Sequence, residues 1–240
     1  MKIYLVGGAV RDKLLGIESK DLDYVMVLDN IEMSAEEGFK IMEKYLEEEG
    51  FKIHTTHPDK FTIRAKFPKG HKNEKQDADF VLARKEIGYE EGTRSPILEL
   101  GTLFDDLIRR DFTVNAMAED DEGNIIDLFE GRIDLKYKVL STPQRASVTF
   151  NDDPLRVLRA LRFSVTKGFS LSPEVRQAIR NKSIITKLKQ VVSKERVRDE
   201  VLKMTKHDTV KTVKILSKFD LLDVCFGDDM WLKPTFEKKQ

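Results

Sequence analysis

The sequence lacks most of the features by which membrane, secreted and metal-cluster proteins are recognised. Cys225 is the single cysteine in 240 residues, so no internal disulfide can form, which fits a reducing cytosol. No apolar run approaches the ~20 residues that a membrane-spanning helix needs, and the N-terminus does not have the pattern of a signal peptide. The four histidines are scattered without metal-ligand spacing. With 35% charged residues, these absences predict a globular, cytoplasmic protein.

The chain also has no net charge, but the two signs are unevenly distributed. Residues 1–153 hold 22 Lys and Arg against 32 Asp and Glu, whereas residues 154–218 hold 17 against 5. An acidic part followed by a basic part suits a metal-dependent enzyme with a polyanionic substrate such as RNA. Two protein surfaces whose charges are simply solvated, with no RNA partner, would also give such counts. The length allows one large or two small domains.

The first informative stretch covers residues 3–16 and combines a predicted strand, two glycines and a short predicted helix. Because Gly7 and Gly8 have no Cβ, a ligand can lie against their backbone N–H groups. The helix that follows presents unpaired N–H groups and a positive dipole end, which suits an anion such as a triphosphate. Arg11 adds a positive charge to this helix. A Gly-Gly pair is also often only a tight turn, so this stretch alone does not specify a nucleotide site.

Two aspartates follow on the next predicted strand. Asp21 and Asp23 are two residues apart, so their carboxylates project from the same face. A divalent cation would relieve their repulsion, and hard cations that bridge phosphates prefer oxygen ligands. A phosphate cradle with a carboxylate pair predicts phosphoryl or nucleotidyl transfer, although Asp-x-Asp alone is common in loops. Asp79, at the start of a later predicted strand, is either a third carboxylate of this site or a solvated residue.

A second informative stretch covers residues 102–118. Its first part predicts a helix capped by Thr102, with Arg109 and Arg110 in the last turn. Arginines at this end of a helix could simply complement the helix dipole. That interpretation does not account for Asp111 and Asn115 beside them.

The third informative stretch covers residues 151–163. Asn151 or Asp152 is a suitable cap for a helix with Pro154 in its first turn. On that helix, three leucines predict the core face and three arginines a neighbouring basic strip: Leu155, Leu158, Leu161, Arg156, Arg159 and Arg162. Asp153 and Arg156 are expected on one helix face. Their acceptors and donors can satisfy the Watson–Crick edges of both cytosine and adenine.

The remaining segments carry ordinary secondary-structure signals. A capping box predicts a helix over residues 34–49, and residues 51–67 and 79–84 have the alternation of strands. Two glycines among charged residues predict a mobile loop over residues 85–96. After residue 168 the sequence predicts four helices, which begin near residues 172, 183, 193 and 209.

The three informative stretches resemble, in order and with compatible spacing, the motifs of class II tRNA nucleotidyltransferases (CCA-adding enzymes) and their bacterial poly(A) polymerase relatives. The resemblance implies that Asp21 and Asp23 hold two magnesium ions and that Gly8 and Arg11 hold the triphosphate. It also implies that Arg110 contacts the nucleotide phosphates, with Asp111 and Asn115 near the sugar. Asp153 and Arg156 would read the base as a protein template, and the arginines that would contact the incoming nucleotide are Arg159 and Arg162.

One residue departs from the family's pattern. Asp152 stands where the family usually has glutamate, and its shorter side chain would weaken the bracing of the template arginine. Nucleotide choice is therefore less firmly implied than the reaction. The family also has a flexible loop near residues 85–96 that is involved in switching between nucleotides, but it cannot be matched residue by residue.

The expected fold class is α+β. A nucleotidyltransferase (polymerase β-like) head with a small mixed sheet is expected over residues 1–140. An all-helical neck that selects nucleotides and binds RNA is expected over residues 141–226, with a loose tail over 227–240. The expected reaction is template-independent, magnesium-dependent transfer of CMP and AMP from CTP and ATP onto the 3′ end of tRNA. The open alternatives are a poly(A) polymerase, a CC-only or A-only enzyme, and a non-catalytic RNA-binding module.

Overall fold

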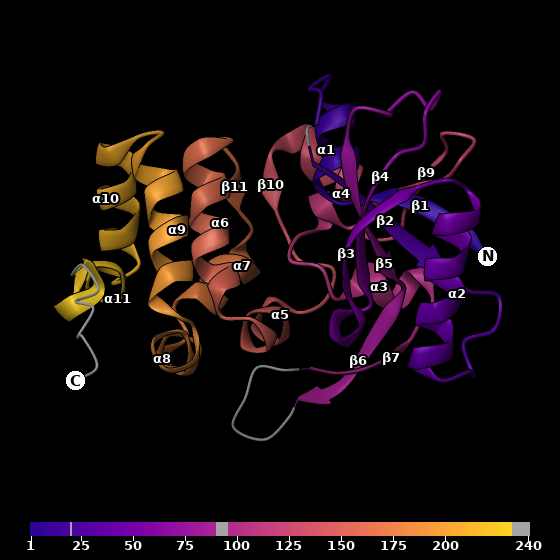
Figure 1. The fold of residues 1–240 in the computed structure, drawn as a ribbon. Coiled ribbons are helices and arrows are strands. Elements are labelled where there is room, and N and C mark those ends of the chain that lie inside the picture. The colour runs from indigo at the N-terminus through magenta and orange to yellow at the C-terminus, as the bar shows by residue number, and fades with distance from the viewer. Residues whose placement is uncertain (20, 90–95, 232–240) are drawn as a thin grey trace, which may run out of the picture. The chain divides into compact units, whose positions relative to one another are not determined.

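The computed structural model describes residues 1–19, 21–89 and 96–231, and these residues form two compact units (Figure 1). The head unit comprises Met1–Tyr137 and Ser141–Gln144. The helical unit comprises Lys138–Leu140 and the chain from Arg145 onward. Among the helices of these described residues, none is long and apolar enough to cross a lipid bilayer.

The head unit contains a seven-stranded sheet with the order β3-β4-β5-β2-β1-β8-β9. The pairing of β2 with β5 is parallel and the other pairings are antiparallel, so the expected mixed sheet is confirmed. The strands are β1 (Lys2–Val6), β2 (Leu22–Val27), β3 (Lys52–His57), β4 (Thr62–Lys66), β5 (Asp77–Leu82), β8 (Met117–Glu119) and β9 (Ile125–Asp127).

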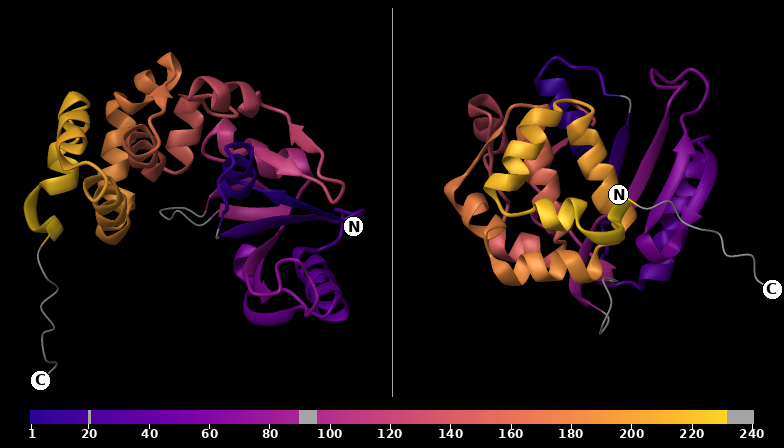
Figure 2. Two further views of the ribbon diagram at one scale, coloured as in Figure 1. Left: turned by 90° about the horizontal axis from the view of Figure 1, so that it is seen from above. Right: turned by 90° about the vertical axis from the view of Figure 1, so that its left-hand side faces the viewer.

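One face of this sheet is covered by helix α2 (Ala35–Glu48), as Figures 1 and 2 show. The predicted capping box is present, because the Glu37 backbone N–H donates to the Ser34 hydroxyl at 3.2 Å and the Glu37 carboxylate accepts from Ser34. The apolar stripe of α2 packs on buried strand residues such as Phe80, which stacks on Tyr24 with ring centroids 5.2 Å apart. Burial of aromatic and aliphatic side chains on this face therefore stabilises the packing of α2 against the sheet.

The other face carries a smaller apolar cluster formed by Val6, Val25, Ala83, Leu107 and Ala118. Leu107 comes from the short helix α3 (Leu103–Ile108), which begins at Thr102 as predicted. Because side chains alternate along a strand, Asp23 projects from β2 on the same face as Val25. The elements that complete the head are α1 (Gly8–Leu14), η1 (Pro58–Lys60), η2 (Thr113–Asn115) and α4 (Gly131–Tyr137).

The prediction of a mobile loop over residues 85–96 is wrong at both ends of that range. Strands β6 (Arg84–Tyr89) and β7 (Pro96–Leu100) pair as an antiparallel hairpin, and residues 90–95 lie outside the described residues. The glycine taken as a loop signal, Gly88, instead sits at a shift of the pairing register. A glycine inside a strand often marks such a bulge, so it does not have to end the strand.

The helical unit begins with a short parallel pair of strands, β10 (Val139–Leu140) and β11 (Ser170–Leu171). Within it, α6, α9 and α10 pack side by side (Figures 1 and 2). Helices were expected near residues 172, 183, 193 and 209, and all four are present. The helices are α5 (Ala146–Asp152), α6 (Leu155–Thr166), α7 (Pro173–Ile179), α8 (Lys182–Val191), α9 (Lys194–Thr205), α10 (Thr209–Lys218), α11 (Leu222–Phe226) and η3 (Asp228–Trp231). Residues 232–240 of the expected tail lie outside the described residues.

The expected start of the helix after residue 151 is wrong. Asn151 and Asp152 form the last turn of α5, and α6 begins at Leu155. Proline disfavours helical backbone in the residue before it, and Asp153 is accordingly extended, with φ −131° and ψ 99°. Pro154 therefore separates two helices where the sequence suggested the start of one.

The close approach of Gly131 to Thr113 generates a stability prediction. A Cβ on Gly131 would overlap the Thr113 carbonyl oxygen and lie 3.0 Å from Met117 Cγ. We expect Gly131→Ala to lower the free energy of unfolding by about 1–3 kcal/mol because the backbone must shift. Ile133→Ala on the same helix, where the side chain is 53% exposed, should change it by no more than about 0.5 kcal/mol. Urea unfolding measures both, and equal stabilities for the two variants would contradict the close packing.

Candidate active site

The first turn of α1 and the strand β2 meet at Gly7. Gly7 has φ 73° and ψ −135°, a backbone conformation that side chains with a Cβ rarely adopt. A Cβ at this position would lie 3.0 Å from Arg110 Nη1 and 3.7 Å from Asp23 Oδ2. The absence of a side chain therefore lets a guanidinium and a carboxylate approach the backbone together. Gly8, the first residue of α1, lies beside Arg11, whose Nη2 would be 3.3 Å from a Cβ on Gly8.

Several charged side chains surround the carboxylate of Asp23. Burial raises the pKa of the Asp23 carboxyl, and the neighbouring Asp79 and Asp21 raise it further, whereas Arg110 and Arg64 act in the opposite direction. The anionic form of Asp23 is therefore only partly compensated by protein charges. Such a cluster of hard oxygen donors is the chemistry that Mg²⁺ prefers, so the donor set fits a divalent cation.

Asp79 lies directly opposite Asp23 in the β2–β5 pairing, but its carboxylate has another partner. Arg64 is its neighbour on β4 and donates from Nη1 to Asp79 Oδ1 at 3.1 Å. Across residues 1–19, 21–89 and 96–231, no group of three or more acidic, His or Cys side chains is arranged to hold a metal ion. The structure thus places Asp79 in an ion pair with Arg64, and its part as a third ligand beside Asp21 and Asp23 stays a prediction.

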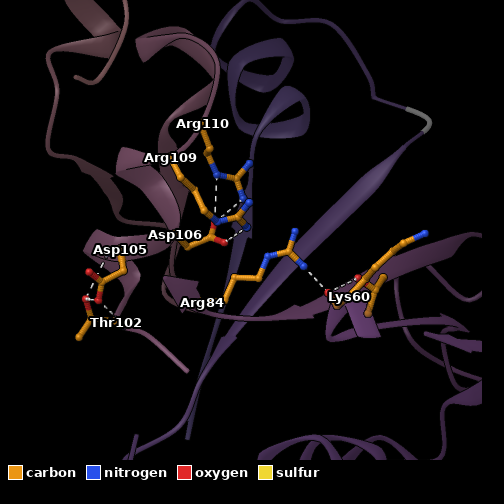
Figure 3. Close-up of polar contacts among 8 residues, drawn as sticks. Lys60, Arg84, Thr102, Asp105, Asp106, Arg109 and Arg110 are labelled. Atoms are coloured by element: carbon orange, nitrogen blue, oxygen red, sulfur yellow. Dashed lines mark hydrogen bonds and ion pairs between the residues drawn. The ribbon is translucent and has the colours of Figure 1, made fainter. Parts of the chain in front are cut away.

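Both arginines after α3 bind a single buried carboxylate (Figure 3). Asp106 has no exposed side-chain surface, and its Oδ2 accepts from Arg110 Nη2 at 2.7 Å and from Arg110 Nε at 3.1 Å. Arg109 donates to the other oxygen. Burial alone would raise the pKa of Asp106, but the two guanidinium groups outweigh it and lower the pKa to about 2. Asp106 is therefore ionised at neutral pH.

The interpretation of these arginines from the sequence missed Asp106. Two functions were considered for these arginines, complementing the helix dipole and binding phosphate. Neither function requires a buried carboxylate of the protein as a partner. A signal for it was present, because Asp106 precedes Arg109 and Arg110 by three and four residues and such pairs share a helix face.

Arg11, Asp111 and Asn115 are brought together in one buried network. Arg11 donates to both oxygens of Asp12, each at 2.8 Å, and to Asn115 Oδ1. Asn115 Nδ2 then donates to Asp111 Oδ1 at 2.9 Å, and the same oxygen accepts from the Phe112 backbone N–H at 2.8 Å. A satisfied buried network of this kind is rigid. It ties α1, which begins at Gly8, to η2.

In the helical unit, Asp153 and Arg156 do not share a helix face, because Asp153 precedes α6. Asp153 Oδ1 accepts from the Leu155 backbone N–H at 3.2 Å, and its Oδ2 lies 3.4 Å from Arg196 Nη2 on α9. Arg156 Nη1 donates to the Thr149 carbonyl at 3.2 Å. Both predicted base-reading residues are thus held by neighbours within their own unit.

The other two arginines of the strip are half-buried on α6, and the three predicted core leucines are buried. Arg162 Nε donates to Glu200 Oε2 at 2.5 Å, and Glu200 is only 3% exposed. The basic strip therefore supplies an ion pair between α6 and α9. Contact of Arg159 and Arg162 with a nucleotide stays a prediction.

The chain matches two known protein families. Residues 3–141 match the poly A polymerase head domain, and residues 168–228 match a probable RNA- and SrmB-binding site of polymerase A. Among curated proteins, the multifunctional CCA protein of Hahella chejuensis is 36% identical over 209 residues, which cover 85% of this chain and 43% of that protein. The tRNA nucleotidyltransferase cca1 of Schizosaccharomyces pombe is 32% identical over 240 residues, covering 94% and 46%. This chain thus spans less than half the length of these two relatives.

Solved structures agree with this relationship. A tRNA nucleotidyltransferase complexed with a primer tRNA and an incoming ATP analog gives a TM-score of 0.71 at 32% identity, covering 94% of this chain and 59% of that one. The CCA-adding enzyme of Bacillus stearothermophilus in complex with CTP gives 0.70 at 28% identity, covering 91% and 48%. Since the head-domain match includes more than half of the chain, the resemblance seen in the motifs is confirmed. The chain belongs to the poly A polymerase head-domain family.

Proposed function

We propose that this chain transfers CMP and AMP from CTP and ATP onto the 3′ end of tRNA and releases pyrophosphate. The observation that carries the proposal is the meeting of Asp23, Arg110 and Gly7 at the start of α1. A carboxylate, a guanidinium and a backbone turn without a side chain are the groups that metal-assisted phosphoryl transfer needs. The names of the relatives support tRNA as the acceptor, and the basic residues 154–218 suit a polyanion.

Magnesium fits the pair Asp21 and Asp23. When bound, it would activate the RNA 3′-hydroxyl and stabilise the leaving pyrophosphate. The protein's own part is to place the Asp23 carboxylate on the face of β2 that borders Gly7, with Asp21 directly before the strand. The β1–β2 pairing does this by holding Asp23 opposite Val6.

The triphosphate is proposed to lie against Gly8, Arg11 and Arg110. Arg110 Nη1 points toward Gly7, where a fixed positive charge can stabilise the negative charge that develops on the phosphates. Arg11, Asp111 and Asn115 contribute by fixing the start of α1 through their buried network. Direct contacts of Asp111 and Asn115 with the sugar follow from the family resemblance.

Nucleotide choice is proposed to depend on Asp153 and Arg156. A guanidinium held by the Thr149 carbonyl and a carboxylate held by Arg196 keep defined orientations, which hydrogen bonding to a base edge requires. Asp152 lies at the end of α5, where the family usually has glutamate. The carbonyl of Thr149 is one group that braces Arg156.

A poly(A) polymerase is the second candidate, because the matching head family is named for that activity. The two candidates differ in their products. A tRNA that lacks its 3′ CCA is incubated with magnesium and with CTP, ATP or both, and the products are weighed by mass spectrometry. Addition of C, C and A supports the first proposal, whereas repeated addition of A alone supports the second. A product that stops at CC would show a CC-only enzyme. Addition of A only to a tRNA that already ends in CC would show an A-only enzyme.

Replacement of Asp23 tests the metal assignment. We expect Asp23→Asn to lower the rate of nucleotide incorporation by about a thousandfold or more, because loss of a metal ligand removes several kcal/mol of transition-state stabilisation. Asp121→Asn, in an exposed turn of the head, is the matched control and should retain the parental rate. Circular dichroism checks that both variants are folded. Wild-type-like turnover by Asp23→Asn would refute the assignment.

Replacement of Arg156 tests the base-reading assignment. Arg156→Ala should reduce the preference for CTP and ATP over UTP and GTP by roughly 10- to 100-fold, since one good base contact contributes ~1–3 kcal/mol of discrimination. The measurement is kcat/KM for each of the four triphosphates. Arg176→Ala, on the exposed side of α7, should leave the ratios unchanged. Selectivity that survives in Arg156→Ala would contradict the role.

A further inference from the structure

Arg110 is held along one edge by a carboxylate that the proposed reaction does not use. Its Nε and Nη2 both donate to Asp106 Oδ2, at 3.1 and 2.7 Å, as Figure 3 shows. The opposite nitrogen, Nη1, is the atom that would lie 3.0 Å from a Cβ on Gly7. Because a guanidinium is planar and its donors are fixed relative to one another, binding one edge determines where the remaining nitrogen points.

The carboxylate itself has no room to move. Asp106 is fully buried, and its second oxygen accepts from Arg109. It comes from α3, whose Leu107 is buried in the apolar cluster. A buried charge with both oxygens satisfied is retained only in that geometry. Asp106 is therefore a rigid anchor for a long, flexible side chain.

The anchor also separates Arg110 from a competing carboxylate. Asp23 Oδ2 would lie 3.7 Å from a Cβ on Gly7, and Arg110 Nη1 3.0 Å from it, so both groups border the same small space. Without Asp106, the guanidinium could turn its two-donor edge to Asp23 and form the strong bidentate pair that arginine and carboxylate favour. Asp23 would then be occupied by a protein cation.

We infer that Asp106 is a positioning residue of the nucleotide site: it holds Arg110 with Nη1 toward the triphosphate and keeps the guanidinium from pairing with Asp23. This inference rests on the proposed nucleotidyl transfer. It assigns two tasks to one buried carboxylate, namely orienting the phosphate ligand and leaving the metal ligand available. Neither task requires Asp106 to touch the nucleotide.

The first experiment compares Asp106→Asn with Asp105→Asn. Both changes remove a charge from α3, but Asp105 bonds only Thr102 in the capping box among the interactions given for the described side chains. Asp106→Asn should raise the KM for CTP at least about tenfold, as expected when hydrogen bonds to a charged group are lost. It should also raise the Mg²⁺ concentration for half-maximal rate. Asp105→Asn should change both by less than about twofold, at a temperature where both are folded.

A double-mutant cycle then tests whether Asp106 acts through Arg110. In an Arg110→Ala background, Asp106→Asn should cause no further rise in KM for CTP, because the group it positions is gone. Additive losses, or equal effects of Asp105→Asn and Asp106→Asn, would overturn the inference and leave Asp106 a purely structural residue.

A third measurement does not depend on turnover. In ¹⁵N spectra of the unmodified protein, the Arg110 Nε–H should exchange slowly with solvent, because it is bonded to a buried carboxylate. Its signal is assigned by its loss in Arg110→Lys. Rapid exchange of that proton would overturn the positioning role, whatever the enzyme activity. Slow exchange in a protein that adds no nucleotide would instead show that the proposed function fails while the anchor is present.

Discussion

The candidate site depends on the register between β1 and β2. Val6 pairs with Asp23 in this antiparallel ladder, so the chain reaches Gly7 beside the carboxylate. A slip by one residue would turn Asp23 to the opposite face of the sheet. The register is fixed by the buried alternation of both strands, with Val6 and Val25 in one cluster and Met26 in the other. Hydrophobic packing therefore positions the polar site.

Within this frame, two aspartates of the head have opposite electrostatic behaviour. Burial raises the pKa of Asp23, which Arg110 compensates only in part, whereas two arginines lower the pKa of the buried Asp106 to about 2. The carboxylate that is fully paired within the protein, Asp106, holds Arg110 in place. The one that is incompletely compensated retains capacity for an external cation. Arg110 contacts Asp106 and borders Asp23, so it links the two.

Sequence reasoning succeeded where structure depends on neighbours along the chain. The helix after Ser34, the start of α3 at Thr102 and the four later helices follow from caps and periodicity. It failed where one residue is compatible with two different local structures. Gly88 indicated a loop but forms a bulge in a hairpin, and Pro154 indicated the first turn of one helix but separates α5 from α6. Strand pairing within the hairpin decided the first case, and the effect of proline on the backbone of Asp153 decided the second.

In the candidate site, the sequence indicated the charged residues themselves but not the residues that hold them in place. The motifs identified the charged residues because their types and spacing carry the chemistry, but several of their partners are far away in the chain. Arg11 is bonded to Asn115 across 104 positions, and Arg162 to Glu200 across 38. Such pairs cannot be derived from local pattern, since only the folded topology brings them together. Asp106 differs, because it lies within one helical turn of Arg110. It was missed because a buried carboxylate is informative only once burial is known.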